Sequence, residues 1–124
     1  RMAGTSPDGL VGEDGLVEIK NPGAPVHIDY LLGNGIAGEY WQQCQGQLYV
    51  TGRKWCDLIA YSRVLPPLVH RYTRDEPYLS RLGAALDTFV AHMLAQRAKL
   101  VALGCKPAGM VPQVVGENSD AMPF

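Results

Sequence analysis

The stretch SPDGLVGEDGLVEIKNP, residues 6–22, limits the fold more than any other part of the sequence. Apolar residues flank the turn-forming run Gly-Glu-Asp-Gly on both sides, which predicts a β-hairpin over residues 4–22. Asp8 lies in the first arm of this hairpin, and Glu18 and Lys20 lie in the second. The hairpin is therefore either an exposed element with ordinary surface charges or a metal site shared by two strands.

The length of the turn decides whether these three charged residues meet. A two-residue Asp14-Gly15 turn would pair position 8 with position 21, and Asp8 would point away from Glu18. A three-residue loop over residues 13–15 would instead pair position 8 with position 20, and position 10 with position 18. Asp8, Glu18 and Lys20 would then share one face of the hairpin.

The apolar residues of the hairpin favour the three-residue loop. In that register Val11, Val17 and Ile19 lie together on the face opposite the charges. Burying these branched side chains together would stabilise the hairpin, so the sequence predicts that they form its covered face.

The charged face has the composition of a metal site. In the favoured register the Cβ atoms of Asp8 and Lys20 are expected about 5 Å apart, with Glu18 on the diagonal at about 7–8 Å. Two carboxylates so placed can converge on a hard cation such as Mg²⁺ or Mn²⁺. A nearby ammonium can orient or deprotonate a metal-bound water and stabilise charge that develops on a phosphate.

The next segments are predicted to be a loop and a helix. Residues 23–36 contain Pro25 and several glycines, and predict a loop with a short turn. Residues 39–52 predict a helix in which Trp41, Cys44 and Leu48 share the core face.

The second half predicts two strands, a long helix and a tail. Residues 54–63 and 68–74 are rich in aromatic and branched side chains and are separated by Pro66-Pro67. A helix begins near residue 76 and ends at Gly104, with an apolar stripe that predicts packing: Leu79, Leu82, Leu86, Phe89, Val90, Met93 and Leu100. The order of elements predicts an α/β or α+β domain with a mixed sheet.

Composition excludes several classes of protein. The 124 residues suffice for one modest domain, and 47% apolar against 19% charged residues predicts a folded chain. No apolar run is long enough to span a bilayer, and the chain does not open with a secretory signal. Three dispersed cysteines fit a reducing cytosol and are too few for a four-ligand iron–sulfur cluster. The net charge of −1 gives no general attraction to nucleic acid, so DNA binding would have to rest on a specific site.

Three motifs taken together resemble a known family. SPDGL, GLVEIKNP and the later YWQQCQGQLYVTG resemble the lambda-exonuclease-like, YqaJ-type viral recombinase nucleases of the PD-(D/E)xK superfamily, from residue 4 to about residue 75. The resemblance implies a restriction-endonuclease-like core, a mixed β-sheet flanked by helices, over residues 1–105. The helices that the family carries upstream of the first strand are expected to be lacking. Residues 106–124 are expected to form a flexible tail.

The resemblance also assigns roles to residues of the hairpin. Asp8 matches the family's first metal-binding aspartate, Glu18 its second acidic ligand, and Lys20 its catalytic lysine. The backbone carbonyl of Ile19 is implied as a further metal ligand. Mg²⁺, or alternatively Mn²⁺, is the implied cofactor.

The glutamine-rich helix carries the remaining implied site residues. Gln45 and Tyr49 match a QxxxY signature that lies beside the active site in the family, so both are expected at the site. Gln45 also borders the core face and would need a hydrogen-bond partner if buried. Gly46 is expected to leave room for a neighbouring segment. Gln47 is expected on the polar surface of the helix.

Other residues are predicted to contact DNA or solvent. Gln43 is expected on the polar surface, and with Gln42 it is a candidate DNA-binding residue. Five basic residues could form a rim for phosphates, of which the first two are the leading candidates: Arg53, Lys54, Arg63, Arg71 and Arg74. His27, His70 and His92 show no metal-ligand spacing and are expected at the surface or in loops.

The function implied by the resemblance is metal-dependent exonucleolytic hydrolysis of linear double-stranded DNA, with 5′-3′ strand resection in phage-type recombination. Double-stranded DNA ends, a single-strand annealing protein and further copies of the chain in a trimer are the implied partners. The implied location is the cytoplasm of a bacterium or of a phage-infected host cell. The alternative is a non-catalytic DNA-binding or assembly module that retains the nuclease scaffold.

Overall fold

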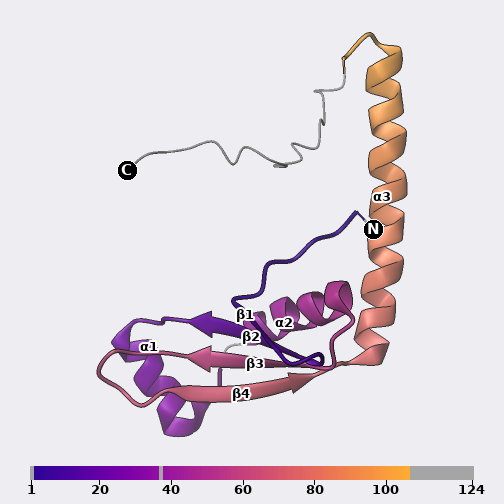
Figure 1. Ribbon diagram of the computed structural model, residues 1–124. Helices are drawn as coiled ribbons and strands as arrows, with labels where there is room; N and C mark the ends of the chain where they lie inside the picture. Colours follow the sequence, from indigo (N-terminus) through magenta and orange to yellow (C-terminus); the bar gives the residue numbers. More distant parts are fainter. Residues whose placement is uncertain (1, 37, 107–124) are drawn as a thin grey trace, which may run out of the picture. The chain divides into compact units, whose positions relative to one another are not determined.

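The computed structural model describes residues 2–36 and 38–106. Figure 1 shows the elements in this order: β1 (Gly9–Val11), β2 (Gly15–Lys20), α1 (Ala24–Asp29), the π-helix η1 (Tyr30–Asn34), α2 (Gly38–Thr51), β3 (Trp55–Ala60), β4 (Leu68–Thr73) and α3 (Glu76–Ala102). The strands form a four-stranded sheet in the order β1-β2-β3-β4, in which β2 and β3 are parallel and the outer pairs are antiparallel. The predicted α+β class with a mixed sheet is confirmed.

The chain divides into two compact units, residues 1–88 and 89–124, and the boundary falls inside α3. The division of the chain at residue 105 stays a prediction, and residues 107–124 of the expected tail lie outside the described residues. None of the helices in the described ranges is long and apolar enough to cross a membrane.

The core of the first unit lies between α2 and one face of the sheet. It contains Leu16 of β2, Cys44 and Leu48 of α2, and Cys56 and Leu58 of β3, all fully buried. The predicted core face of the helix is thus confirmed at Cys44 and Leu48, whereas Trp41 is only half-buried. After Thr51 the chain turns at Gly52, whose φ of 72° lies in the left-handed region that glycine adopts without strain.

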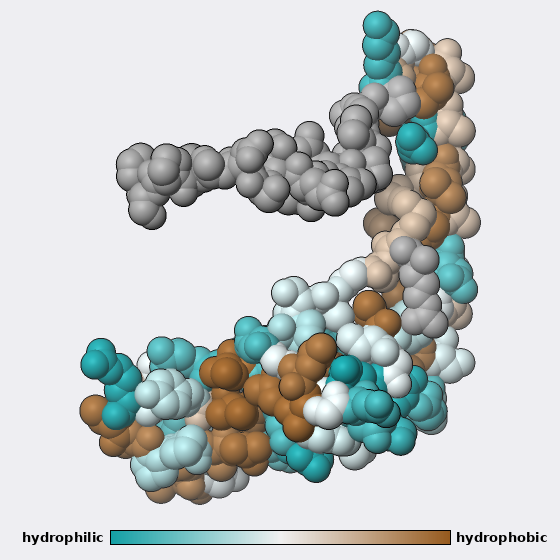
Figure 2. All heavy atoms as spheres, viewed as in Figure 1, coloured by the Kyte–Doolittle hydropathy of each residue, from teal (hydrophilic) through white to brown (hydrophobic). Residues whose placement is uncertain are grey.

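The opposite face of the sheet is more open than the sequence predicts. Val11 and Ile19 are exposed, Ile19 by 49%, and so is Val69 of β4. Figure 2 shows apolar side chains gathered over the part of the molecule that contains the sheet. The prediction that Val11, Val17 and Ile19 form the covered face of the hairpin is wrong. It failed because α2 covers the other face, the one that carries Leu16 and Glu18.

Residues 24–34 form two short helices where the sequence predicts a loop. Pro25 stands in the first turn of α1, where its missing N–H costs no hydrogen bond and its fixed φ suits a helix. Proline is also common in loops, which is why the sequence alone favours a loop here, and the prediction is wrong for this segment.

His27 of α1 was also misplaced by the sequence, because its side chain is fully buried. Its Nε2 lies 2.7 Å from the carbonyl oxygen of Pro66, which connects α1 to the segment between β3 and β4. Since a carbonyl can only accept, Nε2 carries the proton of this hydrogen bond. His27 is therefore a structural residue rather than a surface or loop histidine.

The predicted long helix is confirmed as α3, with Pro77 in its first turn. Leu79 is buried, as the apolar stripe predicts, but Phe89 is 62% exposed and Leu100 is also exposed. A helix of 27 residues is about 40 Å long, and Leu79 near its start is its buried residue. The packing prediction is therefore wrong for Phe89 and Leu100.

Gln45 lies on the core side of α2 and is fully buried. Its Nε2 donates to the carbonyl of Thr73 at 2.7 Å, and its Oε1 accepts from the N–H of Asp75 at 2.9 Å. The expectation that a buried Gln45 needs partners is confirmed. The amide holds α2 against the junction between β4 and α3.

We expect Gln45→Leu to lower the free energy of unfolding by about 1–2 kcal/mol, because it leaves a carbonyl and an N–H that water reaches only in part. Urea denaturation followed by tryptophan fluorescence measures the change. Gln42→Leu is the matched control, since Gln42 is exposed on the same helix and should leave stability within about 0.5 kcal/mol. Equal effects of the two substitutions would contradict the structural role of Gln45.

Candidate active site

The hairpin has a three-residue turn, but one that starts a residue earlier than predicted. Val11 pairs with Gly15, so the turn is residues 12–14, and the ladder continues with Gly9 opposite Val17. Gly12 takes the left-handed conformation of this turn, with φ of 53°. One step beyond the ladder this register brings position 8 opposite position 18, not position 20 as predicted. The shift is two residues, so Asp8, Glu18 and Lys20 keep the same face of the sheet, as predicted.

Asp8 follows directly from this register. It stands just before β1 and is exposed, and its Oδ2 accepts a hydrogen bond from the N–H of Ile19 at 2.6 Å. In an antiparallel pair the N–H and C=O of one residue point to the same neighbouring strand. The carbonyl of Ile19 therefore faces the same edge as Asp8, beyond the end of the β1 ladder.

Glu18 is the most enclosed charged group of the site, with 5% exposure. Its Oε1 accepts from Lys20 Nζ and from Gln43 Nε2, both at 2.7 Å. Its Oε2 accepts from Gln47 Nε2, also at 2.7 Å. These donors supply the hydrogen bonds that a carboxylate needs when it is removed from water.

Lys20 stands at the rim of the same cluster. Besides Glu18, its Nζ donates to Gln43 Oε1 at 2.8 Å and lies 5.2 Å from the ring centre of Tyr40. Burial alone lowers the pKa of Lys20, but the hydrogen bond and charge of Glu18 outweigh burial and raise the pKa above its ordinary value. Lys20 is thus an ammonium group held against the carboxylate.

Gln47 is the site residue that sequence reasoning missed. It is 3% exposed rather than on the polar surface, and it contacts Glu18 through its nitrogen and the thiol of Cys56 through its Oε1 at 3.7 Å. The hydrogen bond with Cys44, together with burial, raises the pKa of Cys56, so this group stays a thiol. In the sequence, only the spacing of four between Gln43 and Gln47 indicates that Gln47 shares a helix face with Gln43.

The predicted QxxxY pair does not join the hydrogen bonds around Glu18. Gln45 points to β4 and α3, as described above. Tyr49 packs against α3 at Gly83, so closely that a side chain at position 83 would have its Cβ 2.9 Å from the Tyr49 hydroxyl oxygen. The side chain of Gln45 therefore does not contact the carboxylates, because residues 45 and 47 lie on different sides of the helix, and its expected role at the site stays a prediction. Tyr49 instead lines a cleft beside the site.

The basic residues predicted to form a rim for phosphates contact other parts of the molecule than the Asp8–Glu18 face. Arg53 donates to the carbonyls of Gly12 and Gly15, and Lys54 pairs with Asp14 at 2.9 Å, so both contact the turn of the hairpin. Arg71 and Arg74 are paired with acidic residues. The structure does not bring these side chains to the Asp8–Glu18 face, and their role in DNA binding stays a prediction.

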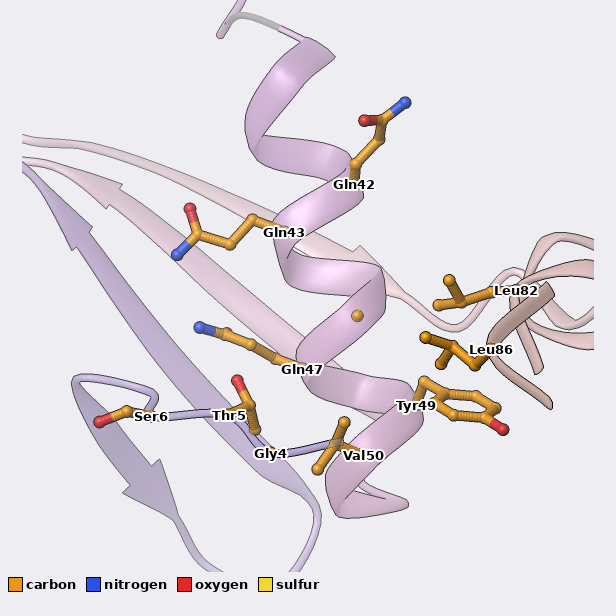
Figure 3. Close-up of a pocket in the computed structure, with 11 residues that line it drawn as sticks. Gly4, Thr5, Ser6, Gln42, Gln43, Gln47, Tyr49, Val50, Leu82 and Leu86 are labelled. Carbon is orange, nitrogen blue, oxygen red and sulfur yellow. The ribbon is translucent and has the colours of Figure 1, made fainter. Parts of the chain in front are cut away.

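A cleft of about 320 Å³ is lined in part by Gln43 and Gln47, the two glutamines that donate to Glu18 (Figure 3). One wall is the segment before β1, with the hydroxyls of Thr5 and Ser6, and another is the face of α2 that carries Gln42, Gln43 and Gln47. Figure 3 shows the side chains of Gln43 and Gln47 extending from α2 on the side of the hairpin. The same amides that donate to Glu18 thus line the cleft.

The donor set fits a magnesium ion. Mg²⁺ is usually bound through one or two carboxylates together with waters and substrate phosphates. Asp8 and Glu18 supply two carboxylates on one face, and the carbonyl of Ile19 faces the same edge as Asp8. Within residues 2–36 and 38–106 no group of three or more His, Cys, Asp or Glu side chains could hold a metal. A soft or all-protein metal site is therefore not formed by the described residues, whereas an oxygen site completed by water or phosphate is compatible with them.

An aspartate on one arm of the hairpin, Glu-x-Lys on the next strand and a mixed sheet are the features by which the chain resembles nucleases. Comparisons with known proteins agree. Residues 1–54 match the YqaJ-like viral recombinase domain. The alkaline exonuclease LHK-Exo of Laribacter hongkongensis has a similar structure, with 35% identity, a TM-score of 0.71, and coverage of 80% of this chain and 53% of that one. The structure of LHK-Exo in complex with dAMP gives a TM-score of 0.70 at the same identity and coverage.

The similarity to the YqaJ-like viral recombinase domain thus covers residues 1–54, and the similarity to the alkaline exonuclease covers 80% of the chain. The chain spans about half the length of the exonuclease that it matches. No curated protein sequence matches it.

Proposed function

We propose that this protein is a magnesium-dependent deoxyribonuclease that degrades linear double-stranded DNA from its ends, in the 5′-3′ direction. The observation that carries the proposal is the placement of Asp8, Glu18 and Lys20 on one face, with Glu18 and Lys20 2.7 Å apart. Kinship with the alkaline exonuclease LHK-Exo supports it. So does the complex of LHK-Exo with dAMP, a mononucleotide of the kind that DNA hydrolysis releases.

Each residue has a role that follows from its environment. Asp8 and Glu18, with the carbonyl of Ile19, would hold one or two Mg²⁺ ions, which would supply a Lewis acid for the phosphodiester and its attacking water. Lys20 places a positive charge where the phosphate gains negative charge in the transition state, and it orients the water. Gln43 and Gln47 fix the carboxylate of Glu18 and thereby keep it in position before substrate binds.

The wider setting is proposed from the family. We expect the protein to act on DNA ends during phage-type recombination in the cytoplasm of a bacterium or infected host. A ring-shaped trimer and a single-strand annealing protein are the expected assembly and partner. Size-exclusion chromatography with light scattering tests the trimer.

The direct test is hydrolysis of DNA by the purified protein. With Mg²⁺ we expect release of mononucleotides from linear duplex DNA, early loss of a 5′-terminal label and late loss of a 3′-terminal label. EDTA should stop the reaction, and closed circular DNA should stay intact. Lys20→Met should lower the rate by about 10²-fold, because it removes one stabilising charge from the transition state.

Lys99→Met is the matched control, since Lys99 lies in the last turn of α3, away from the hairpin in sequence. It should hydrolyse DNA at the unmodified rate. If the unmodified protein binds duplex ends but releases no nucleotide with Mg²⁺ or Mn²⁺, the nuclease proposal fails and the alternative, a non-catalytic DNA-binding or assembly module, takes its place.

A further inference from the structure

We infer that the cleft lined by Gln43 and Gln47 receives the sugar–phosphate backbone of the DNA strand, and that Gly46 is the residue that admits it. The inference rests on the proposed function, since it names the part of the substrate that would occupy this cleft. Three features of α2 and the cleft carry it: a glycine that packing does not require, an uncharged lining that includes hydrogen-bonding groups, and two lining glutamines that also contact Glu18.

Gly46 lies in the interior of the 14-residue helix α2. Glycine destabilises a helix interior relative to alanine, because its unfolded backbone has more freedom to lose. The usual structural reasons for keeping it do not apply here. Its φ is not positive, and a Cβ built on it would meet nothing within 4 Å among the described residues. Alanine would therefore fit the folded chain and favour the helix.

The space in front of Gly46 is the cleft. Gly46 lines it together with Gln42 and Val50, which are four residues before and after it on the same side of the helix. A missing side chain at the centre of such a row allows a ligand to approach the helix backbone closely, which is a common use of glycine beside a bound molecule.

The chemistry of the cleft suits a nucleotide chain. Its lining combines polar residues, namely Thr5, Ser6 and the glutamines of α2, with the apolar side chains of Val50, Leu82 and Leu86, and no charged side chain lines it among the described residues. Hydroxyls and amides are common partners of phosphate oxygens and sugars in complexes with DNA. A volume of about 320 Å³ is at the small end of ligand sites, which favours one nucleotide unit over a duplex.

The cleft is also placed to deliver that unit. Gln43 and Gln47 line it and donate to the two oxygens of Glu18 at 2.7 Å. The same two glutamines would thus lie between a phosphate held at Glu18 and a strand unit in the cleft. Small displacements of a reacting phosphate cost much rate, since a misplacement of about 1 Å can lower catalysis by about 10²-fold.

The test compares Gly46→Ala with Gly38→Ala in the purified full chain. Gly38 begins α2, has open space around it and does not line the cleft. We expect Gly46→Ala to keep or raise the melting temperature and to lower kcat/KM on linear duplex DNA by at least about tenfold. Gly38→Ala should change neither quantity appreciably.

A second measurement separates this inference from the proposed function. In EDTA, where no hydrolysis is expected, a fluorescently labelled short single-stranded oligodeoxynucleotide should bind the unmodified protein, and Gly46→Ala should weaken that binding by about tenfold. If the unmodified protein binds the oligonucleotide without hydrolysing DNA, and Gly46→Ala weakens binding, the nuclease proposal fails while the cleft assignment stands. If Gly46→Ala hydrolyses DNA and binds the oligonucleotide like the unmodified protein, the cleft assignment is overturned.

Discussion

Asp8→Asn will reduce DNA hydrolysis by about 10³-fold or more while the protein stays folded. Asp8 is exposed, and its one described hydrogen bond, from the N–H of Ile19, can be accepted equally by the amide oxygen of asparagine. The substitution therefore removes a negative charge with little change of shape. A hard divalent cation depends on anionic oxygen ligands. A metal stabilises a phosphoryl transition state by several kcal/mol, and each 1.36 kcal/mol changes the rate about tenfold.

The measurement is the rate of mononucleotide release over a range of Mg²⁺ concentrations, with stability followed by urea denaturation. Asp14→Asn is the matched control, because Asp14 is an exposed aspartate in the turn of the same hairpin and its partner is Lys54. Asp14→Asn should retain full activity. Hydrolysis by Asp8→Asn at the rate of the Asp14→Asn protein would show that the metal-site assignment is wrong.

The sharing of a face by Asp8, Glu18 and Lys20 was predictable because strand side chains alternate with a period of two. The predicted pairing was wrong by two residues, yet such a shift leaves each side chain on its original face. The position of the turn was not predictable in the same way. Gly12 and Gly15 can both adopt unusual backbone conformations, but Gly12 takes the left-handed one, while Gly15 lies in β2 against the ring of Trp55.

Which face of the hairpin is covered could not be read from its own residues. Local hydrophobicity assigns the interior to Val11, Val17 and Ile19, whereas the fold covers the face of Leu16 and Glu18 with α2. The helix can cover a charged face because Gln43 and Gln47 bring hydrogen-bond donors to Glu18. This pairing joins residues that lie 25 and 29 positions apart, so no local pattern in the hairpin specifies it.

Gln47→Leu will lower the free energy of unfolding by about 1.5–3 kcal/mol. Gln47 is the only described side chain that donates to Glu18 Oε2, and both residues are almost fully buried. Leucine fills a similar volume but cannot donate, so the buried carboxylate loses one hydrogen bond that nothing else among the described side chains replaces. A hydrogen bond to a charged group is typically worth about 1.5–3 kcal/mol, and the ion pair of Glu18 with Lys20 stays in place.

Gln43→Leu is the matched control, since Gln43 donates to the same carboxylate at the same distance of 2.7 Å but from an exposed position. Water can replace its amide, so we expect a loss below about 1 kcal/mol. Urea denaturation of the two variants side by side gives the difference directly. Similar losses in both proteins would mean that water reaches Glu18 Oε2 after the substitution, and that burial of the carboxylate does not depend on Gln47. A larger loss for Gln47→Leu would identify α2 as the element that holds the carboxylate of Glu18 in position through Gln47.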